Sequence, residues 1–289
     1  MNHFRLEADC LPLVLRSASR LAVLFLAHCL QCAFGQPAPD DGEGKETAAA
    51  QTSAAQAQNP IAHVISVPFQ NNALTRTGPS RNTADTLLIQ PVVPIKIDAD
   101  WSVITRTIVP IVHLPRTSLA QGELTGLGNI EPQFYVTPAH PGKFIWGAGA
   151  QAWLPTATVD ALGVNKWGGG PAVVGLVIDG HWVAGALLNN VWAGSGKGRV
   201  NEMTLNPFAN YNLARGWYLA STPVITSNWD RPSSERWTVP VGGGFGRVFK
   251  IAGLNVNARL EVFRNVERPR YAAATDIQAQ LQLLFPEHQ

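Results

Sequence analysis

The sequence predicts an all-β fold, a transmembrane antiparallel up-and-down β-barrel of about twelve strands. Three observations predict it: segments that alternate apolar and polar residues, connections that alternate between short and long, and tryptophans near strand ends. After residue 36 the chain has no uninterrupted apolar run of about 18 residues, which a spanning helix needs. With 46% hydrophobic residues, 15% charged residues and a mean hydropathy of +0.02, the chain is expected to be either such a barrel or a soluble protein.

Residues 1–35 are predicted to be a signal peptide. Two arginines precede the apolar run LAVLFLAHCLQCAFG, and the small residues Ala33 and Gly35 place cleavage before Gln36. The alternatives are an amino-terminal anchor, for which the run is short, and a lipoprotein. All three cysteines lie in this segment, so the mature chain is expected to contain no disulfide, thiol nucleophile or cysteine-bound zinc.

Residues 36–58 are rich in Ala, Gln and Pro without apolar periodicity, and they are predicted to be a disordered periplasmic segment. Residues 59–289 are predicted to form the barrel. Their twelve segments of strand character begin near His63, Asp85, Trp101, Gly128, Lys143, Lys166, His181, Glu202, Gly216, Arg236, Leu254 and Thr275.

The connections between these segments differ in length by parity. Every second one is tight, namely IDAD, PAHPG, IDGH, LARG and IAGL. The others are long and polar, namely NNALTRTGPSRNTA, RTSLAQGELTG, TATVDALGVN, AGSGKGRVN, NWDRPSSE and NVERPRYAAA. Membrane barrels have short periplasmic turns and long outer loops, whereas a soluble sandwich has no reason to sort its loops in this way.

Tryptophans cluster near the ends of the predicted strands rather than at their centres, as expected for aromatic belts at two membrane interfaces. Those in the predicted belts are Trp101, Trp182 and Trp217 after short turns, and Trp153, Trp167, Trp192, Trp229 and Trp237 beside long loops.

The stretch GLNVNARLEV, residues 253–262, places apolar side chains on one face of a strand and polar ones on the other. Within a barrel the polar face would line the lumen, where Arg259 and Glu261 could pair. The same pattern predicts these lumen-lining residues along a possible substrate path: Gln90, Arg106, Gln133, Asn206, Asn210, Asn212, Asn257, Arg259, Glu261, Gln278, Gln280 and Gln282. The alternative is that such residues fill a narrow, closed barrel.

Several motifs, among them IQPVVPIKIDADWSVITRTIVP, KWGGGPA, NPFANYNLARGWYLASTPVITSNWD and WTVPVGGGFGRVF, resemble a family of bacterial outer-membrane barrels. Its members are regarded as transporters related to the barrels of meta-pathway phenol degradation, and some carry the label neuromedin U. The resemblance spans about Asn59 to Pro286. It implies passage of small molecules, with apolar or aromatic compounds as the expected class. The family supplies no catalytic or ligand residues, and Asn129 stands where Asp is expected.

The last predicted strand ends on Phe285, which resembles the carboxyl-terminal signal read by the barrel assembly machinery. The expected partners are therefore outer-membrane lipid, this machinery and a small solute, for a monomer in the outer membrane of a Gram-negative bacterium. A net charge of +2 without a basic block gives no footprint for nucleic acid.

No enzyme, cofactor or metal site is predicted. An outer-membrane phospholipase is the rival, but its chemistry needs a His beside a nucleophilic Ser, and the histidines after residue 36 are scattered. The second functional hypothesis is a non-conducting barrel that serves a structural or surface-interaction role.

Overall fold

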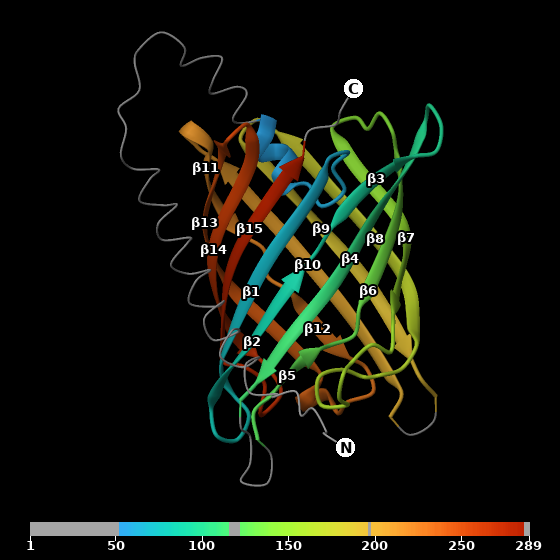
Figure 1. Ribbon diagram of the computed structural model, residues 1–289, viewed down its shortest axis with the longest axis vertical. Coiled ribbons are helices and arrows are strands. Elements are labelled where there is room, and N and C mark those ends of the chain that lie inside the picture. The colour runs from blue at the N-terminus through green and yellow to red at the C-terminus, as the bar shows by residue number, and fades with distance from the viewer. Residues whose placement is uncertain (1–51, 116–121, 196–197, 286–289) are drawn as a thin grey trace, which may run out of the picture. The chain divides into compact units, whose positions relative to one another are not determined.

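The computed structural model describes residues 52–115, 122–195 and 198–285, and the predicted signal peptide lies outside them. One antiparallel sheet curls round and closes into a barrel (Figure 1). Its strands are β1 (Ile65–Thr77), β2 (Asn82–Ile89), β3 (Val92–Lys96), β4 (Trp101–Leu114), β5 (Leu124–Leu127), β6 (Glu131–Pro138), β7 (Phe144–Trp153), β8 (Gly168–Asp179), β9 (Trp182–Ala193), β10 (Val200–Asn212), β11 (Trp217–Ser221), β12 (Ile225–Asn228), β13 (Trp237–Ile251), β14 (Leu254–Glu267) and β15 (Thr275–Phe285).

The described strands make twelve spans of the barrel wall, because β2 and β3, β5 and β6, and β11 and β12 each share one span. This confirms the predicted fold class and strand number. Neighbours along the chain pair antiparallel, and β15 pairs with both β14 and β1, so that Ile65 lies opposite Phe285. The last span therefore closes the barrel against the first.

The two ends of the barrel differ in their connections. Five connections of two to five residues lie at one end, which we call the short-turn end (Figure 1, top). Longer connections lie at the other, the long-loop end, as the sequence predicted for five of the six. The exception is NNALTRTGPSRNTA, which forms a hairpin: β1 and β2 extend through it and pair up to Thr77 and Asn82. These polar residues lack the apolar alternation by which the sequence analysis located strands.

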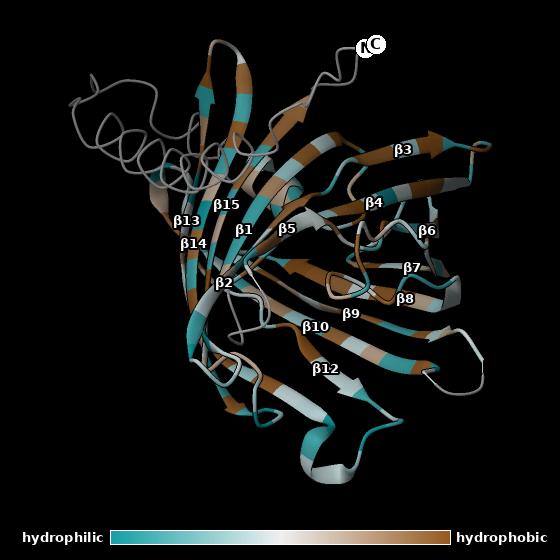
Figure 2. Cartoon of the chain, turned by 60° about the horizontal axis from the view of Figure 1, so that its bottom comes forward, coloured by the Kyte–Doolittle hydropathy of each residue, from teal (hydrophilic) through white to brown (hydrophobic). Residues whose placement is uncertain are grey.

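The faces of the barrel wall have the polarity opposite to that of a soluble protein. Along β6, Phe134 is 48% exposed, whereas its neighbours Gln133 and Tyr135 are buried inside the barrel. On β14, Val262 is 48% exposed and the adjacent Glu261 is fully buried. Apolar and polar residues alternate along the strands (Figure 2). The barrel thus presents apolar side chains outward and gathers polar ones within.

Residues 52–58 form a short helix, whereas the sequence predicted disorder for this segment; residues 36–51 lie outside the described residues. Ala54 and Ala57 pack against inward-facing Tyr218, Val248 and Leu284. Packing of these two alanines stabilises a helix too short to be stable alone, which is why the local sequence did not reveal it. No helix in the described part of the chain is long and apolar enough to cross a membrane.

Candidate functional site: the barrel interior

Glu261 is the most completely enclosed charge in the described interior. Its Oε2 lies 3.0 Å from Nε of Arg259, the partner that the sequence suggested. The same carboxylate accepts hydrogen bonds from the backbone N–H of Thr222 at 2.9 Å and from its hydroxyl at 2.6 Å. A buried carboxylate is tolerated only when it is paired and hydrogen-bonded in this way.

Thr222 reaches Glu261 because the barrel wall is interrupted at this level. β11 ends at Ser221 and β12 begins at Ile225, so the three residues between them leave the ladder. Asn206 donates from Nδ2 to the carbonyl oxygens of Pro223 at 2.7 Å and Thr222 at 3.4 Å. Asn206 and Glu261 therefore replace ladder hydrogen bonds that the interruption removes. Pro223, which lacks an N–H, is the sequence signal that could have located it.

The glutamine row of β15 forms hydrogen bonds with the strands on both sides. Gln280 accepts from Arg259 Nη2 at 2.8 Å, and Gln278 accepts from Gln70 Nε2 at 3.4 Å. Gln282 accepts from Asn257 Nδ2 at 3.1 Å and donates to the Ser66 hydroxyl at 3.3 Å. The predicted row thus forms part of a hydrogen-bonded seam across β14, β15 and β1.

Asn257 faces inward as predicted but is packed rather than bathed in water. The hydroxyl of Tyr218 donates to its Oδ1 at 2.6 Å, and only 2% of Asn257 is exposed. Gly246 makes room for the Tyr218 ring, because a Cβ at that position would lie 2.3 Å from a ring carbon. At this level the inner face of β11, β13 and β14 is therefore covered by packed side chains.

Three asparagines of β10 face inward, and the first of them, Asn206, replaces lost ladder hydrogen bonds as described above. Asn212 is bonded to the amino-terminal helix, since Gln58 Nε2 donates to its Oδ1 at 2.8 Å. Asn210 lies between them and is 2% exposed.

A second polar group joins Gln90, just after β2, to side chains of β4, β6 and β7. Arg106 donates to Gln90, and Gln133 donates from Nε2 to Gln151 Oε1 at 2.8 Å. Gln151 in turn donates to Glu131 Oε2 at 3.0 Å. Sequence reasoning missed Gln151 and Glu131, although both stand at inward positions of alternating strands.

Part of the interior is apolar, which the sequence did not predict. Ile61, just beyond the amino-terminal helix, packs into a cluster with inward-facing side chains of β3, β4, β6, β8, β9 and β10. Its largest aliphatic and aromatic members besides Ile61 are Ile104, Tyr135, Leu176, Leu187 and Phe208. The interior consequently has an apolar wall as well as polar groups, with residues 52–61 packed against both.

Most of the predicted belt tryptophans lie on the outer face. At the long-loop end, Trp167 and Trp192 are exposed, and the rings of Trp229 and Trp237 meet edge to face with centroids 5.6 Å apart. The members near the short-turn end are Trp101, Trp182 and Trp217, paired respectively with Trp146, Tyr211 and Phe245.

Trp153 is a correction to the predicted belts. It is 8% exposed and packs inside the barrel with Val191 and Ala193, because it shares the inward face of β7 with Gln151. Trp146, which the prediction omitted, occupies the outer face near the short turns.

Two of the described histidines contact groups other than serine. His113 Nδ1 lies 2.7 Å from the Thr125 hydroxyl, and His181 Nδ1 lies 2.8 Å from the carbonyl oxygen of Asn212. Among the described residues, no three His, Cys, Asp or Glu side chains gather into a metal site.

Comparison with solved structures finds the same architecture. The COG4313 outer membrane channel from Pseudomonas putida F1 matches over 86% of this chain and 100% of its own, with a TM-score of 0.61 and 14% sequence identity. The fold is similar to that of an outer-membrane channel. The NanC porin matches over 77% of this chain and 100% of its own, with a TM-score of 0.49 and 9% identity. No family model matches the chain, and no curated protein does.

Proposed function

We propose that this chain is an outer-membrane channel that passes small molecules by diffusion, without cofactor or energy input. The observation that supports this most strongly is the reversed polarity of the wall, with exposed apolar side chains outward and buried polar side chains gathered within beside the apolar cluster. An apolar outer face of this extent needs hydrocarbon around it, and a closed barrel leaves no strand edge unpaired in lipid.

The proposed location is the outer membrane of a Gram-negative bacterium, reached after cleavage of the signal peptide. Aromatic rings near both ends of the outer face support membrane insertion. The proposed partners are lipid, the barrel assembly machinery, which would recognise β15, and a small solute, for a protein acting as a monomer.

For the solute, we propose apolar or aromatic compounds. This class comes from the family resemblance, and the apolar wall around Ile61 supports it, because a path with apolar surface on one side suits a solute with an apolar body. The opposite side offers amide groups that can accompany a polar substituent of the same molecule.

The second candidate function is a closed barrel with a structural or surface-interaction role. Two observations favour it: residues 52–58 pack against the inner wall, and Asn257 and Glu261 are held in buried hydrogen bonds on the inner face. These side chains would have to move, or the path would have to pass beside them, for a solute to cross.

Flux measurements decide between the two. Purified protein in planar bilayers and liposomes is expected to give step conductance and to admit small aromatic solutes. A variant lacking residues 52–58 should conduct more, because the packed helix is removed from the inner wall. Absence of both conductance and solute flux in wild type would exclude the channel. Equal conductance in the two proteins would mean that the helix does not limit passage.

A further inference from the structure

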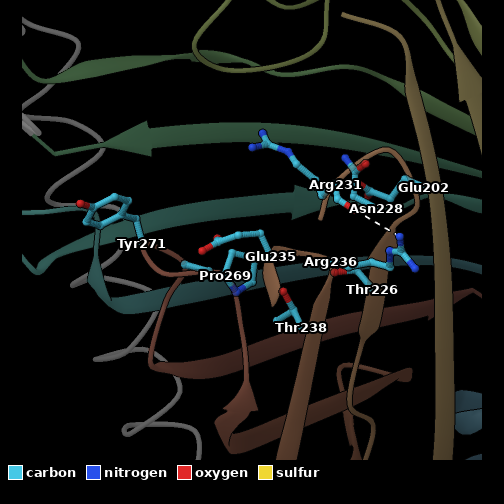
Figure 3. A pocket seen from close by; sticks show the side chains of 10 residues that line it. Glu202, Thr226, Asn228, Arg231, Glu235, Arg236, Thr238, Pro269 and Tyr271 are labelled. Atoms are coloured by element: carbon cyan, nitrogen blue, oxygen red, sulfur yellow. Dashed lines mark hydrogen bonds between the residues drawn. The ribbon is translucent and has the colours of Figure 1, made fainter. Parts of the chain in front are cut away.

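A pocket of about 370 Å³ opens at the long-loop end of the barrel, between β10, β12, β13 and the connection from β14 to β15 (Figure 3). Glu202, Thr226 and Thr238 line it from neighbouring strands, where Thr226 lies opposite Thr238 in the ladder. Its volume lies in the range of small-molecule sites. The pocket is separate from the seam and from the apolar wall described above.

Glu202 brings an unpaired negative charge to this pocket. Its side chain is half-buried, and within the described residues its carboxylate forms neither a hydrogen bond nor an ion pair. Glu131, an acid close enough to repel it, already accepts the amide of Gln151. Because a half-buried carboxylate without a partner is unfavourable, Glu202 is suited to receive a cationic group from outside the protein.

Arg236 brings an unpaired donor of the opposite sign. Its guanidinium lies 5.6 Å from the centre of the Trp229 ring, and its Nη2 donates to the carbonyl oxygen of Arg231 at 3.2 Å. These contacts hold the side chain in place, yet its Nε is buried and has no acceptor in the described structure. Neither of these contacts of the guanidinium is to a carboxylate, so a fixed guanidinium at the pocket is suited to receive one from a ligand.

Asn228 lies between Glu202 and Arg236, and its backbone contacts both residues. It lies opposite Glu202 in the ladder, and its backbone N–H donates to the carbonyl oxygen of Arg236 at 3.0 Å. Glu202 and Arg236 nonetheless form no ion pair with each other. In Figure 3 they appear on one side of the pocket, and Tyr271 and Pro269 on the other. The remaining charged residues of the lining are Glu235, which accepts from the backbone of Arg270, and the exposed Arg231.

We propose that this pocket binds the head group of an α-amino acid with an apolar or aromatic side chain. The ammonium group would pair with Glu202, the carboxylate would accept from the guanidinium of Arg236, and the side chain would extend toward Pro269 and Tyr271. A ligand with only an ammonium group or only a carboxylate would pair with one of Glu202 and Arg236 and leave the other without a partner. The proposal rests on the proposed function in one respect, since only a conducting barrel makes this pocket the first binding site on a path inward.

Calorimetry on the intact barrel in detergent tests the pocket without requiring passage. The probes are phenylalanine, N-acetylphenylalanine, which lacks the ammonium, and phenylalanine amide, which lacks the carboxylate. Each derivative is expected to bind at least about tenfold more weakly than phenylalanine, as for loss of one charge-assisted contact. Glu202→Gln should lower the affinity for phenylalanine to that of wild type for N-acetylphenylalanine. Arg236→Gln should lower it to that of wild type for phenylalanine amide.

Glu267→Gln and Arg264→Gln are the matched controls, because both residues lie on β14 at the same end and neither lines the pocket. They should leave all three affinities unchanged. Equal binding of the three probes by wild type, no binding of phenylalanine, or an equal loss in the controls would overturn the proposal, and the wild-type comparison holds even if a variant fails to fold. Binding without liposome flux would remove the proposed function and keep the site, whereas flux without binding would do the reverse.

Discussion

At the scale of single residues, Glu261 shows how a charged side chain can supply hydrogen bonds where the strand ladder of a barrel is interrupted. Its carboxylate replaces hydrogen bonds that are lost where the chain leaves the ladder at Thr222, and Arg259 neutralises it. Backbone groups in a membrane wall must be satisfied within the protein, so this side chain has a structural task beside any role in the lumen.

Glu261→Gln is expected to destabilise the barrel by about 3 kcal/mol or more, because it leaves the charge of Arg259 buried without its partner. Urea unfolding in lipid vesicles measures the change. Glu267→Gln on the exposed end of the same strand serves as control and should have little effect. Adding Arg259→Gln to Glu261→Gln should recover part of the lost stability. A double variant with a lower free energy of unfolding than the single variant would contradict this explanation.

The sequence predicted which face of the barrel wall an individual residue occupies, but not which side chains it contacts. Alternation along β14 placed Asn257, Arg259 and Glu261 on the inner face, where the structure has them. Their partners come from segments far away in the sequence, such as Tyr218 beside Asn257 and Thr222 beside Glu261. The alternation of residues within one strand does not indicate which distant side chains will lie next to it. Trp153 was misplaced for a related reason, since its nearness to a loop outweighed its register with Gln151.

At the scale of elements, β14 offers a test of membrane depth. Leu260 and Val266 both point outward, but Leu260 lies near the middle of the strand and Val266 at its long-loop end. Leu260→Arg should cost about 2 to 4 kcal/mol of folding free energy in lipid, and Val266→Arg about 0 to 1 kcal/mol. Urea unfolding in vesicles compares them, and equal costs would show that this strand does not cross hydrocarbon.

The elements themselves were predicted well where one face is apolar. The twelve spans and five short turns follow from period-two patterning and turn residues. The extension of β1 and β2 and the helix at residues 52–58 escaped prediction. In both, backbone pairing or distant packing stabilises the element, and the amphipathic signal is missing.

At the scale of the whole molecule, closure depends on the last strand. β15 pairs with β14 over Asn255 to Arg264 and with β1 over Ile65 to Thr75. Deleting residues 281–289 would remove nearly half of both ladders and leave open edges. We expect this truncated chain to remain unassembled in the periplasm. Membrane fractionation and heat-modifiable migration on gels measure this, and a normally assembled barrel would contradict the role given to β15.

On β15, the centre of the closing seam contains no group whose charge changes with acidity. Its central inward groups on β15 are the amides of Gln278, Gln280 and Gln282, which neither gain nor lose protons over the range in which bacteria live. Carboxylates in the same places would repel one another at neutral pH and become neutral in acid. The stability of the pairing between the first and last strands would then vary with pH. With amides there, the three central contacts keep the same strength in acid. The titratable group on β15 is Asp276, which shares their face and accepts from Nε2 of Gln278 at 2.7 Å. Acid outside the cell would therefore act on this junction near its long-loop end and leave its centre unchanged.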